Sequence, residues 1–302
     1  MNSLTLAICT LNREFFLSRC LKALADQTQE FPSVKILIID NGSVDNTRSL
    51  VLNFQNEIEM SYVLESRTGL SHARNKAIEC CDTDYLVFID DDGYPAPGWL
   101  AAVVSAVEKS PDFFGGPFLP YYVEKKPYWY DDRYGSAHVS DDGGFKPWGY
   151  CFSGGNMGWR VECFDDIGRF DPSLGMMGGT LMLGEETALQ LSESAASLTR
   201  LLVPEMLLYH YVSPEKMTLR YIFRRSYVYG YNLDCIDAGS PLLAKGLFRF
   251  LLDVRLFLPL PIRFILSPKK FMSYCADFFS LHAIFIGIFL KKCSVFIKSF
   301  WR

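Results

Sequence analysis

The sequence predicts an α/β fold in which a mostly parallel sheet is flanked by helices. Short apolar runs alternate with amphipathic helical segments through the first third of the chain, and the loops between them are short. The composition, with 49% hydrophobic and 21% charged residues, is that of a folded globular protein. At 302 residues, the chain is long enough to bury a large core as one domain or as two closely joined lobes.

Four apolar runs are predicted to be buried strands of this sheet. They cover residues 4–9, 34–39, 61–64 and 86–89. Helical spacing of apolar residues predicts a helix over 16–27, and Ser43 or Asp45 is expected to cap the next helix. Two further helices are expected to begin near Ser71 and at Pro97. This alternation of strand and helix favours right-handed crossovers between parallel strands.

The fourth apolar run leads directly into three carboxylates, Asp90, Asp91 and Asp92. Because anions this close repel one another, a counter-charge is expected nearby. Mg²⁺ and Mn²⁺ prefer carboxylate oxygen ligands and commonly bridge to substrate phosphates, so a divalent cation is one candidate. A solvated acidic turn is the other interpretation, since Asp and Gly are ordinary turn residues.

Polar residues follow each predicted strand and are expected to meet at one edge of the sheet. These residues are Thr10, Asn12, Arg13, Asp40, Arg67, Asp90 and Asp92. Neither a GxGxxG turn nor a GxxxxGK[ST] loop follows the first strand, which argues against a dinucleotide-dependent dehydrogenase or a P-loop enzyme. A nucleotide at this edge would therefore be held by side chains and a metal.

The region 112–147 is rich in Gly, Pro, Tyr, Trp and Asp and is predicted to be a long loop. Aromatic residues in and beside this loop either stack on a sugar or pack the second lobe, and packing is the favoured interpretation. They are Tyr121, Tyr122, Tyr128, Trp129, Tyr130 and Trp148.

Two adjacent carboxylates, Glu185 and Glu186, open an apolar-periodic helix. Acidic residues at a helix N-terminus interact favourably with the helix dipole, and the alternative role is that of a general base. Predicted strands over 201–203 and 206–209 lead to His210, which is either a structural residue or a metal ligand.

Charge is unevenly distributed along the chain. Residues 241–302 hold ten Lys and Arg against two Asp, a net charge of +8, whereas residues 1–240 hold twenty basic against thirty-two acidic residues, a net charge of −12. The acidic body argues against nucleic acid binding, and the basic, apolar tail favours helices that lie on an anionic membrane surface. A membrane-spanning segment and a buried core helix are the alternatives. The longest uncharged run, 278–290, has 13 residues, whereas a spanning helix needs about 20.

Nine scattered cysteines without a CxxC pair indicate neither a zinc site nor a disulfide framework, which is typical of a reducing compartment. Residues 1–10 lack a basic region before their apolar run and are predicted to form the first strand, not a signal peptide. The expected location is therefore the cytoplasm, with peripheral association at the inner face of the membrane.

Six motifs occur along the chain in a characteristic order. They are Ile8-Cys9-Thr10-Leu11-Asn12-Arg13, Ile39-Asp40-Asn41-Gly42-Ser43-Val44-Asp45-Asn46-Thr47, Gly69-Leu70-Ser71-His72-Ala73-Arg74-Asn75, Asp90-Asp91-Asp92, Gly154-Gly155-Asn156-Met157 and Gly184-Glu185-Glu186. Together they resemble the family 2 glycosyltransferases of the GT-A fold over residues 4–235. The resemblance implies inverting transfer of a sugar from a nucleotide-diphosphate sugar, most commonly a UDP-sugar, to an acceptor hydroxyl in cell-surface polysaccharide or glycan biosynthesis.

The same resemblance divides the chain into a nucleotide-sugar-binding half (1–111), an acceptor-binding and catalytic half (112–235) and a tail (236–302). The basic, apolar composition of the tail favours a saccharide or lipid-linked acceptor at the membrane.

Specific roles are implied by the resemblance. Asp90 and Asp92 would hold Mn²⁺ or Mg²⁺ on the diphosphate, with His210 near the metal. The residues expected to bind substrate are Thr10, Asn12 and Arg13 around the base and ribose, Asp40 at the base ring, Arg74 near the base or diphosphate, Asp91 near the ribose or sugar, Gly155 and Asn156 on the acceptor side, and Arg67 and Gly69 in the loop before Arg74.

Glu186 stands where the family usually has a catalytic Asp and would deprotonate the acceptor hydroxyl, with Glu185 as the alternative base. The metal would act as a Lewis acid on the leaving diphosphate, which needs no further protonation because it is already a weak base. One competing interpretation is a DxD-type phosphatase, but that class carries DxD on its first strand, and three predicted strands precede it here. The other is a catalytically degenerate nucleotide-sugar-binding scaffold at the membrane, which nucleotide turnover would distinguish.

Overall fold

The structure is a computed structural model that describes residues 2–55, 58–136, 151–178 and 182–233, with parts of a helical stretch between 275 and 290. The chain forms two compact units. The first, here called the sheet unit, comprises Met1–Tyr121, Gly135–Thr180 and Glu185–Tyr211. The second, here called the helical unit, comprises Tyr122–Tyr134, Leu181–Gly184 and Val212–Arg302.

A seven-stranded sheet forms the centre of the sheet unit. In spatial order its strands are β3 (Met60–Leu64), β2 (Lys35–Asp40), β1 (Leu4–Thr10), β4 (Tyr85–Asp90), β8 (Asn156–Arg160), β6 (Phe113–Gly115) and β9 (Arg200–Leu202). Only β8 runs antiparallel to its neighbours, so the predicted α/β fold with a mostly parallel sheet is confirmed. From β1 the chain adds β2 and β3 on one side of the sheet and then β4 on the other side of β1. Ligands of open α/β sheets bind at such a switch point, here between β1 and β4.

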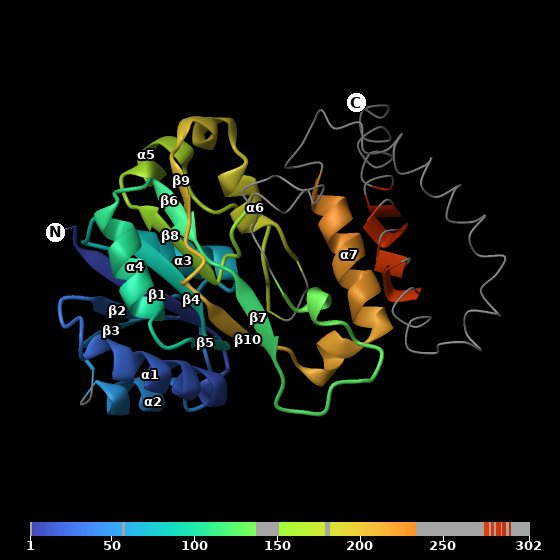
Figure 1. Cartoon of the computed structure of the whole chain (residues 1–302), viewed down its shortest axis with the longest axis horizontal. Coiled ribbons are helices and arrows are strands. Elements are labelled where there is room, and N and C mark those ends of the chain that lie inside the picture. The colour runs from blue at the N-terminus through green and yellow to red at the C-terminus, as the bar shows by residue number, and fades with distance from the viewer. Residues whose placement is uncertain are drawn as a thin grey trace. The chain divides into compact units, whose positions relative to one another are not determined.

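Helices cover both faces of this sheet (Figure 1). On one face α1 (Glu14–Thr28), α2 (Thr47–Phe54) and α4 (Trp99–Glu108) pack on residues such as Leu6 and Ile8. On the other face α3 (Leu70–Cys80), α5 (Cys163–Ile167) and α6 (Glu185–Gln190) pack on residues such as Ala7 and Phe88. Successive strand residues point to opposite faces, which is why the central strands β1, β2 and β4 are mainly apolar on both faces.

A three-stranded sheet carries residues toward the end of β4. Its strands are β5 (Gly93–Pro95), β10 (Leu208–Tyr211) and β7 (Phe118–Tyr121), with β10 in the middle. The register pairs His210 with Gly93, and the Tyr211 amide donates to the Asp92 carbonyl at 3.1 Å. This pairing brings His210 next to the acidic residues that precede Gly93.

The predicted cap of the helix after β2 is only partly right. The residue before α2 is Asn46, whose side chain makes no capping bond. Asp45 accepts hydrogen bonds from the Thr47 amide at 3.1 Å and from the Thr47 hydroxyl at 2.6 Å. Ser43 has a different role, because its hydroxyl accepts a hydrogen bond from the Asn12 amide at 2.8 Å and so joins the loops that follow β1 and β2.

The prediction of an unbroken loop over 112–147 is wrong. Strands β6 and β7 and the short helix η1 (Asp132–Tyr134) lie within it, and residues 137–147 of the predicted loop lie outside the described part of the chain. These strands have three and four residues and include Gly or Pro, so they show too little alternation to be recognised from the pattern.

In the helical unit, α7 (Leu219–Leu233) packs on the helical residues between 275 and 290. The contact is close at Gly230, where a Cβ atom would collide with the backbone of Ile284. Tyr130 is 4% exposed and packs with Tyr122 and Trp129, as predicted for these three residues, and also with Tyr134.

Two predictions for this part of the chain need comment. Tyr128 is 62% exposed, and Trp148 lies outside the described residues. Most of the predicted tail, 236–302, also lies outside them; among the helices that the structure does describe, none has the length and hydropathy needed to cross a bilayer.

Candidate functional site

An acidic cluster stands at the carboxyl end of β4, in the middle of the seven-stranded sheet. Asp90 ends the strand, and Asp91 and Asp92 form the turn into β5. His210 Nε2 lies 3.0 Å from Asp92 Oδ1 and 3.7 Å from Asp90 Oδ2. The structure therefore brings together the three residues that the sequence predicts as metal ligands.

These three side chains fit a divalent cation. One ligand atom from each of Asp90, Asp92 and His210 lies within 4.8 Å of the others. Two carboxylate oxygens and one imidazole nitrogen suit Mn²⁺, and the carboxylates also suit Mg²⁺. Asp92 is only 4% exposed, so a charge on it needs compensation by a nearby cation.

Arg13 and Thr10 provide part of that compensation. Arg13 lies at the end of the β1 loop and donates from NH1 to Asp92 Oδ2 at 2.5 Å and to Asp91 Oδ1 at 3.3 Å. The Thr10 hydroxyl donates to Asp91 Oδ2 at 2.7 Å. Burial raises the pKa of Asp91 well above its usual range, and Arg13 opposes that shift. Both residues were predicted to face the base and ribose, and in this structure both contact the acidic cluster.

Arg74 connects the acidic cluster to α6. Arg74 is buried, and its guanidinium donates from NH1 to Glu185 Oε1 at 2.5 Å and lies 3.8 Å from Asp90 Oδ1. Burial disfavours its charge, but Glu185 and Asp90 outweigh that effect and raise the pKa of Arg74. Arg74 was predicted to approach the base or diphosphate, and its observed partners are both carboxylates of this chain.

Two glycines leave room for these side chains. A Cβ atom on Gly155 would collide with the Asp90 carboxylate, and one on Gly154 would collide with the Arg74 guanidinium. The Gly154-Gly155 pair is therefore explained by close packing against the site. This steric role was not part of the sequence-based prediction.

Glu186 follows Glu185 in the first turn of α6 and is half-buried. Burial raises the pKa of Glu186, the charge of Glu185 raises it further, and Arg74 opposes both. A carboxylate with a raised pKa is a stronger base once it is ionised. Glu185, in contrast, is 4% exposed and engaged with Arg74, which makes it the poorer candidate for contact with an acceptor.

The loops after β1 and β2 are joined around Asp40. Asp40 is 1% exposed and accepts hydrogen bonds from the Ser43 amide at 2.8 Å and the Tyr62 hydroxyl at 2.7 Å. Asn12 has a positive φ of 54°, and its Oδ1 accepts from the Val44 amide at 2.7 Å. The predicted contacts of Asp40 and Asn12 with a nucleotide remain predictions. The bond from Tyr62 had no signal in the sequence.

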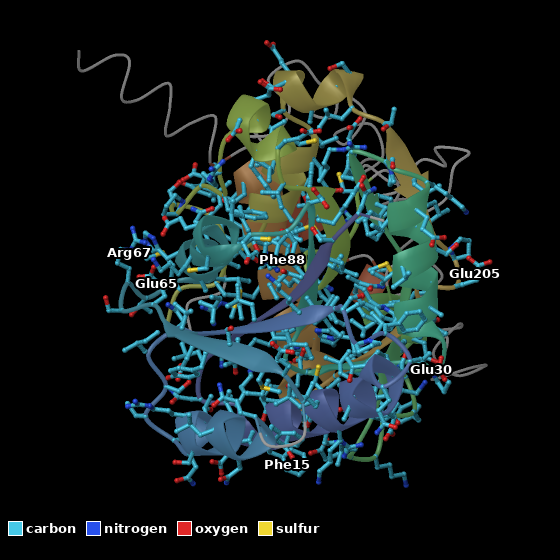
Figure 2. The ribbon with its side chains drawn as sticks, turned by 90° about the vertical axis from the view of Figure 1, so that its left-hand side faces the viewer. Phe15, Glu30, Glu65, Arg67, Phe88 and Glu205 are labelled. Atoms are coloured by element: carbon cyan, nitrogen blue, oxygen red, sulfur yellow. The ribbon has the colours of Figure 1, made fainter. Side chains whose placement is uncertain are left out.

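Arg67 and Gly69, which were also predicted to bind substrate, lie just before α3. Arg67 is exposed and forms a two-pronged ion pair with the buried Glu65, at 2.9 Å and 2.7 Å, and Figure 2 shows the two residues side by side. Hydrogen bonding from Arg67 lowers the pKa of Glu65 to about 2. Gly69 has a φ of +136° and donates its amide to Asn41 Oδ1 at 2.8 Å, so Gly is required for the backbone here.

The predicted role of Asn156 in an acceptor-side loop stays a prediction, and the structure also gives its side chain a structural role. Asn156 begins β8 and has 0% exposed surface. Its Oδ1 accepts from Trp99 Nε1 at 2.9 Å, and its Nδ2 donates to the carbonyls of Pro117 and Met206 at 3.0 Å and 2.8 Å. Asn156 thereby cross-links the core beside the site.

Comparison with known proteins identifies the family. Residues 5–168, more than half of the chain, match the sequence profile of Glycosyl transferase family 2. The chain belongs to glycosyl transferase family 2.

Curated relatives match about a third of the chain. Validoxylamine A glucosyltransferase of Streptomyces hygroscopicus subsp. jinggangensis is 30% identical over 105 residues, which is 34% of this chain and 25% of that protein. GalNAc(5)-diNAcBac-PP-undecaprenol beta-1,3-glucosyltransferase of Campylobacter jejuni is 27% identical over 107 residues, 34% of each chain. The match thus spans a quarter to a third of the length of these relatives.

Solved structures share the fold over most of the chain. The mannosyltransferase PcManGT of Pyrobaculum calidifontis, in complex with GDP-Man and Mn²⁺, has a TM-score of 0.63 at 15% identity and covers 95% of this chain and 87% of that one. S. aureus TarS 1-349, in complex with UDP-GlcNAc, has a TM-score of 0.55 at 14% identity and covers 97% and 92%. The family 2 chain therefore has the GT-A fold that its sequence motifs predicted.

Proposed function

We propose that this chain is an inverting, metal-dependent glycosyltransferase. It transfers a sugar from a nucleotide-diphosphate sugar to a hydroxyl group of a saccharide or lipid-linked acceptor in cell-surface glycan synthesis. The observation that carries the proposal is the cluster of Asp90, Asp92 and His210 at the switch point of a family 2 chain.

The metal fits the chemistry of the cluster. When bound to Asp90, Asp92 and His210, Mn²⁺ or Mg²⁺ would supply Lewis-acid stabilisation of the departing nucleoside diphosphate. Support comes from the donor atoms of these residues and from the burial of Asp92, whose charge otherwise relies on its contacts within the chain. The relative PcManGT was solved with Mn²⁺.

Glu186 is the proposed general base. Its ionised carboxylate accepts the proton of the acceptor hydroxyl, whose oxygen forms a bond to the anomeric carbon while the bond from that carbon to the diphosphate oxygen breaks. Attack from the side opposite the leaving group inverts the anomeric configuration. Glu185 orients this helix turn through its ion pair with Arg74, which also lies beside Asp90.

The donor is proposed to be a UDP-sugar, with GDP- and dTDP-sugars as the alternatives that an experiment must separate. TarS was solved with UDP-GlcNAc and PcManGT with GDP-Man, so the fold accepts more than one nucleotide. The lipid-linked or saccharide acceptor is supported by the name of the Campylobacter jejuni relative and by the basic, apolar tail of this chain. The tail would hold the protein at an anionic membrane surface on the cytoplasmic side.

Release of nucleoside diphosphate tests the proposal directly. The full chain is incubated with UDP-, GDP- and dTDP-sugars, with Mn²⁺ or with a chelator, and compared with D92N. D82N is the matched control, because Asp82 is an exposed Asp that pairs with Lys35 away from the cluster. Metal-dependent turnover of one donor, lost in D92N and kept in D82N, supports the proposal. Binding without turnover of any donor would favour a scaffold.

A further inference from the structure

Arg13 contacts the carboxylates that are proposed to hold the metal. We propose that Arg13 is an internal counter-cation of this cluster, and that its movement couples binding of the divalent cation to binding of the nucleotide diphosphate. This inference rests on the proposed function and adds a positioning role for Arg13 to it.

The same carboxylate serves both cations. Asp92 is one of the candidate metal ligands; its Oδ1 faces His210 Nε2 at 3.0 Å, whereas its Oδ2 accepts from Arg13 NH1 at 2.5 Å. Arg13 also reaches Asp91 Oδ1 at 3.3 Å. A divalent cation at the cluster would therefore share Asp92 with a guanidinium that repels it.

Electrostatics then predicts competition. With the metal absent, Arg13 offsets the repulsion between Asp91 and Asp92, which are both less than 9% exposed. With the metal present, the carboxylates no longer need the guanidinium, and the two positive charges favour its departure. Arg13 thus lowers the metal affinity of the nucleotide-free protein.

The backbone around Arg13 is fixed while its side chain is accessible. The Asn12 amide donates to Ser43 Oγ at 2.8 Å, and the Arg13 carbonyl accepts from the Leu17 amide at 3.0 Å in the first turn of α1. The Arg13 side chain, however, is 40% exposed. Rotation of this side chain can therefore release Asp92 without unfolding the loop.

A diphosphate is the natural new partner of the released guanidinium. Arg donates paired hydrogen bonds to phosphate oxygens, and the proposed donor brings a diphosphate to the same cluster. Transfer of Arg13 from Asp92 to the diphosphate removes a repulsion from the metal and adds an attraction to the nucleotide. By linkage, each of the two ligands then strengthens binding of the other.

The test measures Mn²⁺ affinity by electron paramagnetic resonance of free Mn²⁺, with the full chain alone and with UDP, GDP or dTDP. The proteins are the wild type, R13Q, R13K and D92N. R19Q is the matched control, because Arg19 lies on α1, which follows Arg13, and its guanidinium packs over Phe15 and Tyr121. Thermal melting establishes that each variant is folded.

Without nucleotide, R13Q should bind Mn²⁺ more tightly than wild type, on the order of tenfold, and should gain much less from the nucleotide. R13K, which keeps the charge, should lie close to wild type, and R19Q should match wild type. A purely structural Arg13 predicts the opposite sign, since loss of its bonds would disorder Asp92 and weaken Mn²⁺ binding, and that result would overturn the inference.

The outcomes also separate this inference from the proposed function. Metal-dependent nucleotide binding in the wild type with unchanged Mn²⁺ affinity in R13Q would overturn the coupling alone. Mn²⁺ binding that is equal in wild type and D92N, with every nucleotide, would overturn both the coupling and the proposed metal site.

Discussion

Glu186 has opposite effects on activity and on stability as the pH changes. Its pKa is raised above its ordinary value by burial and by Glu185. A general base works only when ionised, so we expect kcat/KM to rise as the pH passes the raised pKa of Glu186, about 8. E186Q should lower kcat by roughly 10²–10⁴-fold, whereas E193Q, a Glu→Gln change at an exposed position, should not.

The stability contribution of the same group has the reverse sign. Because the pKa of Glu186 is higher in the folded than in the unfolded chain, its stabilising effect is complete below the unfolded value of 4.5 and is lost as pH rises through the folded value. E186Q should therefore melt a few degrees higher than wild type at pH 8–9, since about 1 kcal/mol shifts Tm by roughly 2–4 °C in a domain of this size. Calorimetry at several pH values measures this. An E186Q that melts lower than wild type at high pH would contradict the assigned pKa direction.

Asn156 illustrates how burial separates a structural role from a substrate contact. N156A would leave Trp99 Nε1 and the carbonyls of Pro117 and Met206 without their partner. Each buried polar group left unpaired costs about 1–3 kcal/mol, so the unfolding free energy should fall by at least about 2 kcal/mol.

Urea unfolding measures the loss, with N53A as the control, because Asn53 is exposed on α2. The acceptor KM of N156A should be unchanged. A raised acceptor KM with an unchanged unfolding free energy would instead support the predicted contact of Asn156 with the acceptor.

At the scale of elements, Arg74 on α3 holds the first turn of α6 against the end of β4. The side chains of Arg74 and Glu185 are 4% and 5% exposed, so either charge is costly once its partner is removed. We expect R74Q and E185Q each to destabilise the fold by about 3–5 kcal/mol and the double variant by much less than the sum. Denaturant unfolding of wild type, R74Q, E185Q and the double variant measures this coupling as a double-mutant cycle. K76Q, at an exposed ion pair on the same helix, should lower the unfolding free energy by less than about 1 kcal/mol.

The same variants have a signature in the pH profile. Arg74 lowers the pKa of Glu186, so R74Q should move the activity profile toward higher pH, and K76Q should leave it in place. Additive stability losses and an unshifted profile would show that α3 and α6 are not coupled through this pair.

Elements differed in how far the sequence predicted them. Strands β1, β2 and β4 were predicted because each contains a run of apolar residues that is buried on both faces, and β3 because a shorter apolar run precedes Arg67. Strands β5 and β6 have three residues each, and β8 has a glycine packed beneath Phe114, so local pattern was too weak to reveal them.

The sequence predicted only part of the arrangement of the candidate site. Parallel strands bring their carboxyl ends together, so Asp90 and Asp92 were placed correctly from the sequence alone. The partners of Arg13 and Arg74 were not, because these ion pairs join residues 78 to 111 positions apart. Such pairings depend on strand order, which local sequence does not encode.

At the scale of the whole molecule, charge distribution predicts a membrane-facing tail. Residues 241–302 carry a net charge of +8 on a chain of net charge −4. The full chain should bind anionic phosphatidylglycerol vesicles and should not bind phosphatidylcholine vesicles, which carry no net charge. K291Q/K292Q/K298Q should weaken that binding by up to roughly 10²-fold, since each Lys near an anionic surface contributes about 1 kcal/mol.

Vesicle co-sedimentation measures this, with K22Q/K109Q/K125Q as the control because these lysines are exposed in other parts of the chain. Equal losses in the two triple variants would indicate a general charge effect, and the tail would then have no special role.

Asp90, Asp92 and His210 are proposed to bind a metal that holds a nucleoside diphosphate. Calorimetric titration of UDP, GDP and dTDP, each with and without Mn²⁺, on wild type and D92N tests it most directly. We expect tight binding of one nucleotide that requires Mn²⁺ and is lost in D92N. Binding that is independent of Mn²⁺, or that survives in D92N, would contradict it.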